Sequence, residues 1–447
     1  MCKTTLVCIT FLAILAVAAQ AEEALVVWQH LNPAPLSWEI WYADLDNSFT
    51  PTAAQLVLGG FEGSDHDPAV AYDRAGNAMV VWAHDYGPLL GPKTYGIVYS
   101  RRAAGATTWS APVPIALDFP YWDMDPAVAF DENGNGLCVW VRDLNHDDPS
   151  GPGKFLYYSR WDPNPPVGMP NWSQALEIPR TGGLMEGYRC DTARTPELVF
   201  TSIPGVGGLT SQRAVVVAGL CSPPFMVYNV WDGSNWGDFK IVENPGVAVG
   251  GLTKSAPYRY YSDDLPALHR LSVASDNNGK VLAAWRFLHD PARLWYSYFD
   301  PMLPQTAWIP NAQYTSVSST TPAVVVGPGT NPDNISVFTR KTGFKWFASS
   351  IAGTSGTPLN GTPQSIPVSP VQSDFRPSAA WVTGTNSCVL AVWAHKNPPN
   401  AKDIYLSRWV SGPWDNAVPL VPGGQPGGDR NPDIAAKSGS HTMPPLP

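Results

Sequence analysis

The chain has 447 residues, a net charge of −9, 46 prolines and 19 tryptophans. Its negative charge is spread along the sequence and provides no basic footprint of the kind that nucleic acids and anionic membranes need, so we expect neither partner. Prolines and glycines interrupt nearly every window long enough for a helix, which favours an all-β chain.

The first 21 residues have the pattern of a secretory signal peptide. Lys3 precedes an apolar run from Leu6 to Ala19, and small residues end the segment, which predicts cleavage after Ala21. No later stretch approaches the roughly 20 apolar residues that a membrane span needs. We therefore expect a secreted protein, extracellular or periplasmic, without a membrane span.

Four cysteines remain after the signal peptide, and four cysteines permit three pairings. Cys190 and Cys221 flank one repeat, so we predict a disulfide bond between them. Cys138 and Cys388 lie within apolar strand patterns of distant repeats and are predicted to be small buried hydrophobic residues.

Near-copies of one stretch, Asp67 to Trp82, recur along the chain and predict a β-hairpin. Ala69 to Tyr72 have strand character, Asp73 to Asn77 supply turn residues, and Ala78 to Trp82 form a continuous apolar strand of the buried kind. Prolines that open this hairpin follow one another at intervals of 55 to 70 residues: Pro68, Pro126, Pro196, Pro266, Pro322, Pro377 and Pro432. A period above 50 residues with several strands per period is typical of a propeller blade.

The two ends of the chain complement each other. Residues 24–58 offer only a second, third and fourth strand, whereas Pro432 to Ala436 offer a lone first strand. The sequence therefore predicts a single all-β domain over residues 22–436: a seven-bladed β-propeller closed by a C-terminal strand that joins the N-terminal blade. Residues 437–447 are predicted to be a flexible tail.

The segment Ser100 to Trp109, with Gly105 before Thr107-Thr108-Trp109, resembles the bacterial neuraminidase repeat, or Asp-box, of sialidase-like propellers. That pattern is Ser-x-Asp-x-Gly-x-x-Thr-Trp; here the Asp is missing and the Gly is displaced by one position. The resemblance implies the fold of the family and not its activity. Sialidases of known type are six-bladed rings and carry an Arg-Ile-Pro motif. This chain is predicted to have seven blades, and its nearest counterpart to the motif, Arg376-Pro377, lacks the Ile.

Candidate ligand-binding residues follow from the repeat. In a propeller, the loops before each first strand and after each second strand meet at one mouth of the central channel. Four residues lie two positions after a buried aromatic of a second strand, on consecutive blades, and three further candidates lie just before a first strand. They are His30, His84, Arg142 and His395, and Asp67, Asp125 and Arg376. The alternative is that such side chains only cap turns or contact solvent.

Carboxylates that face histidines at a channel mouth could perform acid and base chemistry on a glycosidic bond, or could hold a divalent cation. No nucleophile motif appears, so no catalytic residue, metal site or cofactor is assigned. The tryptophans that end the second strands are expected to pack between blades rather than stack on sugars.

The functional hypothesis is a secreted, monomeric propeller that recognises a glycan or another extracellular ligand at the channel mouth. One alternative is an enzyme, either a sialidase-like glycoside hydrolase or a polysaccharide lyase that uses the same mouth. The other is a structural propeller that binds an extracellular protein, which an exposed aromatic patch on a different rim would favour.

Overall fold

The computed structural model describes residues 22–437 with gaps at 34–35, 58–61, 88–93, 116–120, 145–152, 180–193, 205–209, 222–223, 243–270, 276–278, 288–292, 300–311, 314–318, 328–333, 341–343, 350–363, 368–373, 384–386, 397–401, 411–412 and 422–427. The described residues form strands and contain no α-helix, which confirms the all-β prediction. Within the same residues, no helix is long and apolar enough to span a bilayer.

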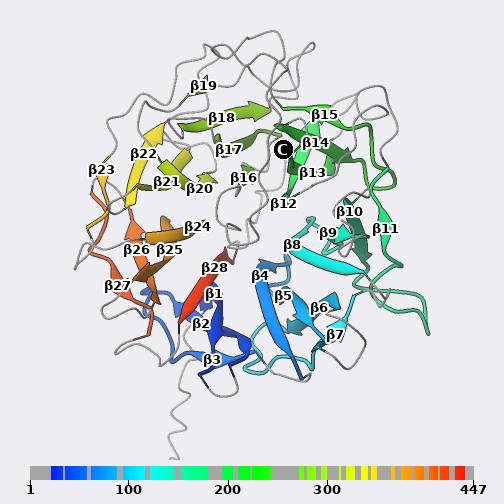
Figure 1. Cartoon of the computed structure of the whole chain (residues 1–447), viewed down its shortest axis with the longest axis horizontal. Coiled ribbons are helices and arrows are strands. Elements are labelled where there is room, and N and C mark those ends of the chain that lie inside the picture. Colours follow the sequence, from blue (N-terminus) through cyan, green and yellow to red (C-terminus); the bar gives the residue numbers. More distant parts are fainter. Residues whose placement is uncertain are drawn as a thin grey trace, which may run out of the picture.

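The strands group into antiparallel four-stranded units that follow the chain (Figure 1). The first unit contains β28 (Asp429–Ala436), β1 (Glu22–Leu31), β2 (Trp38–Asp46) and β3 (Gln55–Leu56). One eight-stranded sheet joins two such units through a single parallel pairing of Tyr95 with Trp122. Its strands are β4 (Ser64–Tyr72), β5 (Ala78–Asp85), β6 (Tyr95–Arg102), β7 (Val113–Pro114), β8 (Trp122–Phe130), β9 (Gly136–Asp143), β10 (Lys154–Trp161) and β11 (Leu176–Glu177).

The remaining sheets repeat the same order of strands. They consist of β12 (Arg194–Pro204), β13 (Thr210–Cys221), β14 (Pro224–Trp231) and β15 (Lys240–Ile241); β16 (Leu271–Ser275), β17 (Val281–Phe287), β18 (Arg293–Phe299) and β19 (Ala312–Gln313); β20 (Ser319–Val326), β21 (Asn334–Arg340), β22 (Phe344–Ser349) and β23 (Gln364–Ser365); and β24 (Asp374–Val382), β25 (Cys388–Lys396), β26 (Lys402–Trp409) and β27 (Val418–Pro419).

The first strands of successive units surround a common axis. Contacts run in order from β4 through β8, β12, β16, β20 and β24 to β28, and β28 contacts β4 again. Residues from each of these strands line one cavity of about 200 Å³. Sheets set radially around a central channel are the arrangement of a β-propeller, as Figure 1 shows.

The core lies between neighbouring sheets, because the second strands are buried on both faces wherever their burial is described. All residues of β5 except Asp85 are buried, as are all residues of β25 except Lys396. Leu25 and Val27 of β1 pack with Val80 and Trp82 of β5 across the gap between two sheets. Cys138 and Cys388 are free and buried, as predicted for small hydrophobic residues, and burial raises the pKa of both thiols.

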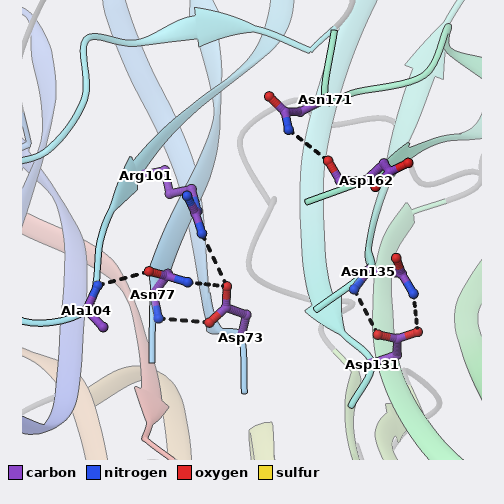
Figure 2. A network of polar contacts seen from close by, with 8 residues as sticks. All are labelled: Asp73, Asn77, Arg101, Ala104, Asp131, Asn135, Asp162 and Asn171. Atoms are coloured by element: carbon purple, nitrogen blue, oxygen red, sulfur yellow. Dashed lines mark hydrogen bonds and ion pairs between the residues drawn. The ribbon is translucent and has the colours of Figure 1, made fainter. Parts of the chain in front are cut away.

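Turn chemistry explains the repeated hairpin. Asp73 accepts the backbone N–H of Asn77 at 2.8 Å and its side-chain amide at 2.6 Å, and Gly76 has a φ of 79°. Figure 2 shows the matching turn in the next unit, where Asp131 accepts the same two groups of Asn135. These loops are therefore side-chain-capped turns, which agrees with their interpretation as hairpins.

The Ser of each aromatic-Ser pair ties the third strand to the fourth. The Ser100 hydroxyl donates to the carbonyl of Ser110 at 2.7 Å, and Ser159 donates to Ser173 at the same distance. Ser407 donates to the carbonyl of Asp415 at 2.8 Å. Each acceptor follows a buried Trp, so the segment that resembles the neuraminidase repeat has a structural role as a corner of the sheet.

Strand β16 lacks the proline that leads the other first strands. Ala69 pairs with Val81, one residue before Trp82, and Ser272 pairs with Ala284, one residue before Trp285. Leu271, opposite Trp285, therefore occupies the position that proline holds at the start of the other first strands. The expectation that Pro266 opens this strand is thereby corrected, and Pro266 itself lies outside the described residues. The predicted partner Cys190, the signal peptide and residues 438–447 also lie outside them.

The chain ends meet in one sheet. Strand β28 pairs with β1 from Ala24–Ala436 to His30–Asp429, and the Lys437 N–H donates to the Glu23 carbonyl at 2.8 Å. Asp433 of β28 adds side-chain bonds to both neighbours: it accepts the N–H of Val70 on β4 at 2.9 Å and the hydroxyl of Ser378 on β24 at 2.7 Å.

We predict that Asp433→Ala lowers the free energy of unfolding by about 1–3 kcal/mol, because it leaves a part-buried backbone N–H and a hydroxyl without their acceptor. Denaturant unfolding measures the change. Asp415→Ala is the control, since Asp415 is 54% exposed and pairs with Arg408 at the surface; its effect should stay within about 0.5 kcal/mol. Equal losses in both variants would contradict the prediction.

Candidate functional site

A repeated distortion marks the start of the first strands. The residue before the proline has a left-handed φ of 47° to 49° at Asp67, Asp125, Arg376 and Asn431. The strand register shifts at the same places. Because proline has no N–H to pair, a bulge there loses no ladder bond. Such a backbone costs on the order of 1–3 kcal/mol per non-glycine residue, and strain of this kind concentrates at binding sites.

Three of these strained residues contact one another across sheets. Asp67 Oδ1 on β4 accepts the Asn431 amide of β28 at 2.6 Å and Arg376 Nη1 of β24 at 3.2 Å. The side chains of Arg376 and Asp67 are 12% and 27% exposed. Asn431 also donates to Gln29 Oε1 at 2.9 Å, and Gln29 Nε2 lies 3.0 Å from His66 Nδ1. We call these five residues the mouth network.

His66 is the titratable end of the mouth network. With Gln29 donating its amide, His66 Nδ1 accepts, and the neutral ring carries its proton on Nε2. Burial lowers the pKa of His66, while the carboxylates of Asp67, Asp65 and Asp85 oppose that shift. His66 therefore favours the neutral form that the contact with Gln29 requires.

The four candidates after the second-strand aromatics are buried, and three of them contact an aspartate of their own sheet. His30 Nδ1 lies 2.7 Å from Asp429 Oδ1, and His84 Nδ1 lies 2.6 Å from Asp65 Oδ1. Arg142 donates to both oxygens of Asp123 at 2.7 and 2.8 Å. His395 is fully buried, between Asp374 and Asp403 in the strand register. Each pair links a first strand to a second strand at the mouth end of both strands.

The aspartates of these pairs share a position, three residues before the proline or its equivalent. Burial raises the pKa of Asp429, and the hydrogen bond and charge of His30 counter that effect. Trp82 adds an indole N–H to Asp65 at 2.7 Å. The pairs hold the ends of the first strands in place and so support the strained residues, which follow the paired aspartates by two positions.

Sequence reasoning placed Asp67 and Arg376 at the mouth, and the structure brings these two together. Gln29 and Asn431 were missed, and His66 was only one of many polar residues in the loops. Asn431 had a usable signal, because it precedes Pro432 as Asp67 precedes Pro68. Asp125 has the same strained backbone on β8.

Aromatic residues adjoin the mouth network. The His66 and Tyr95 rings lie 5.8 Å apart, and Tyr95 lies 4.9 Å from Trp122. Burial and the hydrogen bond to Asp85 raise the pKa of Tyr95 to about 12, so it stays a neutral donor. The second-strand tryptophans are buried to 3% exposure or less, as expected for packing between sheets.

Among the described residues, no group of three or more His, Cys, Asp or Glu side chains is arranged to hold a metal ion. The polar groups at the mouth are instead engaged with one another through hydrogen bonds and one ion pair. The arrangement therefore offers carboxylate, guanidinium and amide groups that can exchange hydrogen bonds with a bound polar molecule.

No family model matches the chain, and no curated protein matches it. Similar solved structures include a Dyadobacter fermentans protein of unknown function (13% identity, 79% of this chain and 96% of that chain, TM-score 0.46) and the NanB sialidase of Streptococcus pneumoniae (8%, 77% and 68%, 0.46). An α-L-arabinanase of Penicillium chrysogenum also matches (14%, 76% and 92%, 0.42). At these identities and TM-scores, no residue role carries over to this chain.

We predict that Arg142→Met lowers the free energy of unfolding by about 3–5 kcal/mol, because it leaves the buried Asp123 carboxylate without its bidentate partner. The control is Arg101→Met, which removes a 33% exposed guanidinium 3.4 Å from Asp73 and should cost less than about 1 kcal/mol. The double variant Arg142→Met, Asp123→Leu should recover much of the loss. Denaturant unfolding of the three variants measures these changes. A loss in Arg142→Met no larger than that in Arg101→Met would contradict the prediction.

His66 also predicts a pH dependence. Its folded-state pKa lies below 6.5, so the unfolded chain binds more protons, and stability falls as the pH drops below about 6.5 toward the folded pKa. We expect His66→Gln to lose less stability between pH 7 and pH 5 than the wild type does. Unfolding curves at both pH values measure this, and equal losses would show that the ring contributes nothing.

Proposed function

We propose that this chain is a secreted, seven-bladed β-propeller, closed by its C-terminal strand, that recognises a glycan or another extracellular ligand at the mouth of its central channel. The single observation that carries the proposal is the convergence of Asp67, Arg376 and Asn431 from three different sheets, each held in a strained left-handed backbone. Strain maintained at one mouth favours a binding role over a purely structural one.

The scaffold supports the blade count in the proposal. Each proline-led or equivalent first strand opens one four-stranded unit, and the order of contacts from β4 to β28 returns to β4. The pairing of β1 with β28 supplies the first strand of the unit that contains both chain ends and so completes its four strands. The predicted signal peptide over residues 1–21 supports export, and a monomer is part of the same proposal.

Glycans suit the chemistry of the mouth network. A sugar hydroxyl both donates and accepts, so adjacent hydroxyls can bind a carboxylate and a guanidinium that lie side by side. Tyr95 and Trp122 are half-buried, adjoin His66 of the mouth network through the Tyr95 ring, and offer apolar ring surface. A few convergent polar groups next to aromatic side chains are typical of small-molecule sites.

The proposal assigns two roles to the predicted site residues. Asp67, Asp125 and Arg376 contact the ligand, together with Asn431. His30, His84, Arg142 and His395 act indirectly, by holding the strand ends that present those residues. The four buried residues are therefore positioning residues in this proposal.

We predict that Asp67→Ala and Arg376→Ala each weaken binding of a glycan identified on an array by at least tenfold, or about 1.4 kcal/mol, since each removes a hydrogen-bonding group from the mouth. Isothermal titration with the identified glycan measures the change. Arg408→Ala is the control, because Arg408 lies near the end of β26 that points away from the mouth. An array without hits, or equal affinity in all variants, would contradict ligand recognition, whereas turnover of a hit would favour the enzyme alternative.

A further inference from the structure

Four cationic side chains gather on the mouth face, where the sheet of β24–β27 meets β28. They come from four different strands: Arg376 of β24, Lys396 of β25, Lys402 of β26 and Arg430 of β28. Strand β28 packs against β24, β25 and β26, which brings these strand ends together. We call the four residues the cationic corner. It stands out in a chain whose net charge is −9.

Two of the cations face each other directly. Lys396, the last residue of β25, is paired in register with Lys402, the first residue of β26. Like charges opposite one another in a sheet are destabilising. Burial lowers the pKa of Lys402, and the charges of Arg430, Arg376 and Lys396 lower it further. The fold therefore keeps these cations together at a cost to its own stability.

Two acidic groups nearby already contact other side chains. Asp67 accepts from Arg376 but also from Asn431. Asp429 lies against His30, and Asp403 is buried opposite His395 in the strand register. Beyond burial, the charges that shift the pKa of Lys402 are those of the three other cations of the corner, and all three lower it.

Arg430 adds a surface on which a ligand can rest. Its guanidinium lies 4.8 Å from the centre of the Trp38 ring, and Arg430 is exposed whereas Trp38 is half-buried. The ring holds the guanidinium at the surface through a cation–π contact. A flat guanidinium fixed in this way can present two parallel N–H groups to an oxyanion.

We propose that the cationic corner is an anion-binding subsite, which takes a sulfate or carboxylate group carried on a carbohydrate ligand. The inference rests on the proposed function and names the ligand class of the same mouth. Arg430 and Lys402 provide the donors, Lys396 adds charge, and Arg376 connects the subsite to the mouth network through Asp67.

Dextran sulfate is the probe, with neutral dextran and inorganic sulfate as comparison ligands, measured by isothermal titration at fixed ionic strength. We expect dextran sulfate to bind and neutral dextran to bind at least tenfold more weakly. Lys402→Gln and Arg430→Gln should each lower the affinity for dextran sulfate at least tenfold. Lys402→Arg keeps the charge and should stay within threefold of the wild type.

Arg408→Gln is the matched control, because it removes one positive charge from the opposite end of β26. Its affinity should stay within twofold of the wild type. A loss as large as that of Lys402→Gln would show non-specific attraction and overturn the subsite. Inorganic sulfate that competes at micromolar concentration would overturn the carbohydrate-borne source in favour of a free anion.

A second readout does not depend on affinity. In protein with labelled lysines, dextran sulfate should raise the pKa of Lys402 followed by NMR, since a bound anion stabilises the ammonium; an unchanged Lys402 would overturn the proposal. The two proposals fail in different ways. If array glycans bind through Asp67 while Lys402→Gln has no effect, only the subsite is wrong. If no glycan binds, recognition at the mouth fails as well.

Discussion

The pairing of β1 with β28 is the interaction on which the rest of the structure depends. It joins residues that lie about 400 positions apart in the sequence, and it places β28 between β24 and β4. Strand β28 then contributes Asn431 to the mouth network, Asp433 to the contacts between first strands and Arg430 to the cationic corner. Assembly of the mouth therefore requires that the two ends of the chain meet.

A second constraint acts in four of the first strands, β4, β8, β24 and β28. Proline cannot donate a ladder bond, so the chain bulges beside it and the preceding residue takes a left-handed backbone. The buried pairs of Asp65 with His84 and Asp123 with Arg142 then fix the strand end on the other side of the bulge. Scaffold and site are thus coupled: the interior charges are used to hold a few surface side chains in a strained but defined position.

Much of the scaffold was predictable because its signals are local. The hairpin of Asp73 to Asn77, the buried second strands and the complementary strands at the chain ends are visible in short windows of sequence. The mouth network was less predictable, since Asp67, Arg376 and Asn431 meet only through the arrangement of the sheets. The pairing of His30 with Asp429 was missed for the same reason, and Leu271 in place of a proline hid one strand start from a search for prolines.

The direction of β1 and β28 has a practical consequence. Strand β1 runs from Glu22 toward the mouth, and β28 runs from the mouth back to Ala436, beside Ala24. The chain therefore enters β1 at Glu22 and leaves β28 at Ala436 on the face opposite the mouth. A carrier protein or a solid support attached before Glu22 or after Lys437 would hold the molecule from behind, with the channel opening presented outward and unobstructed.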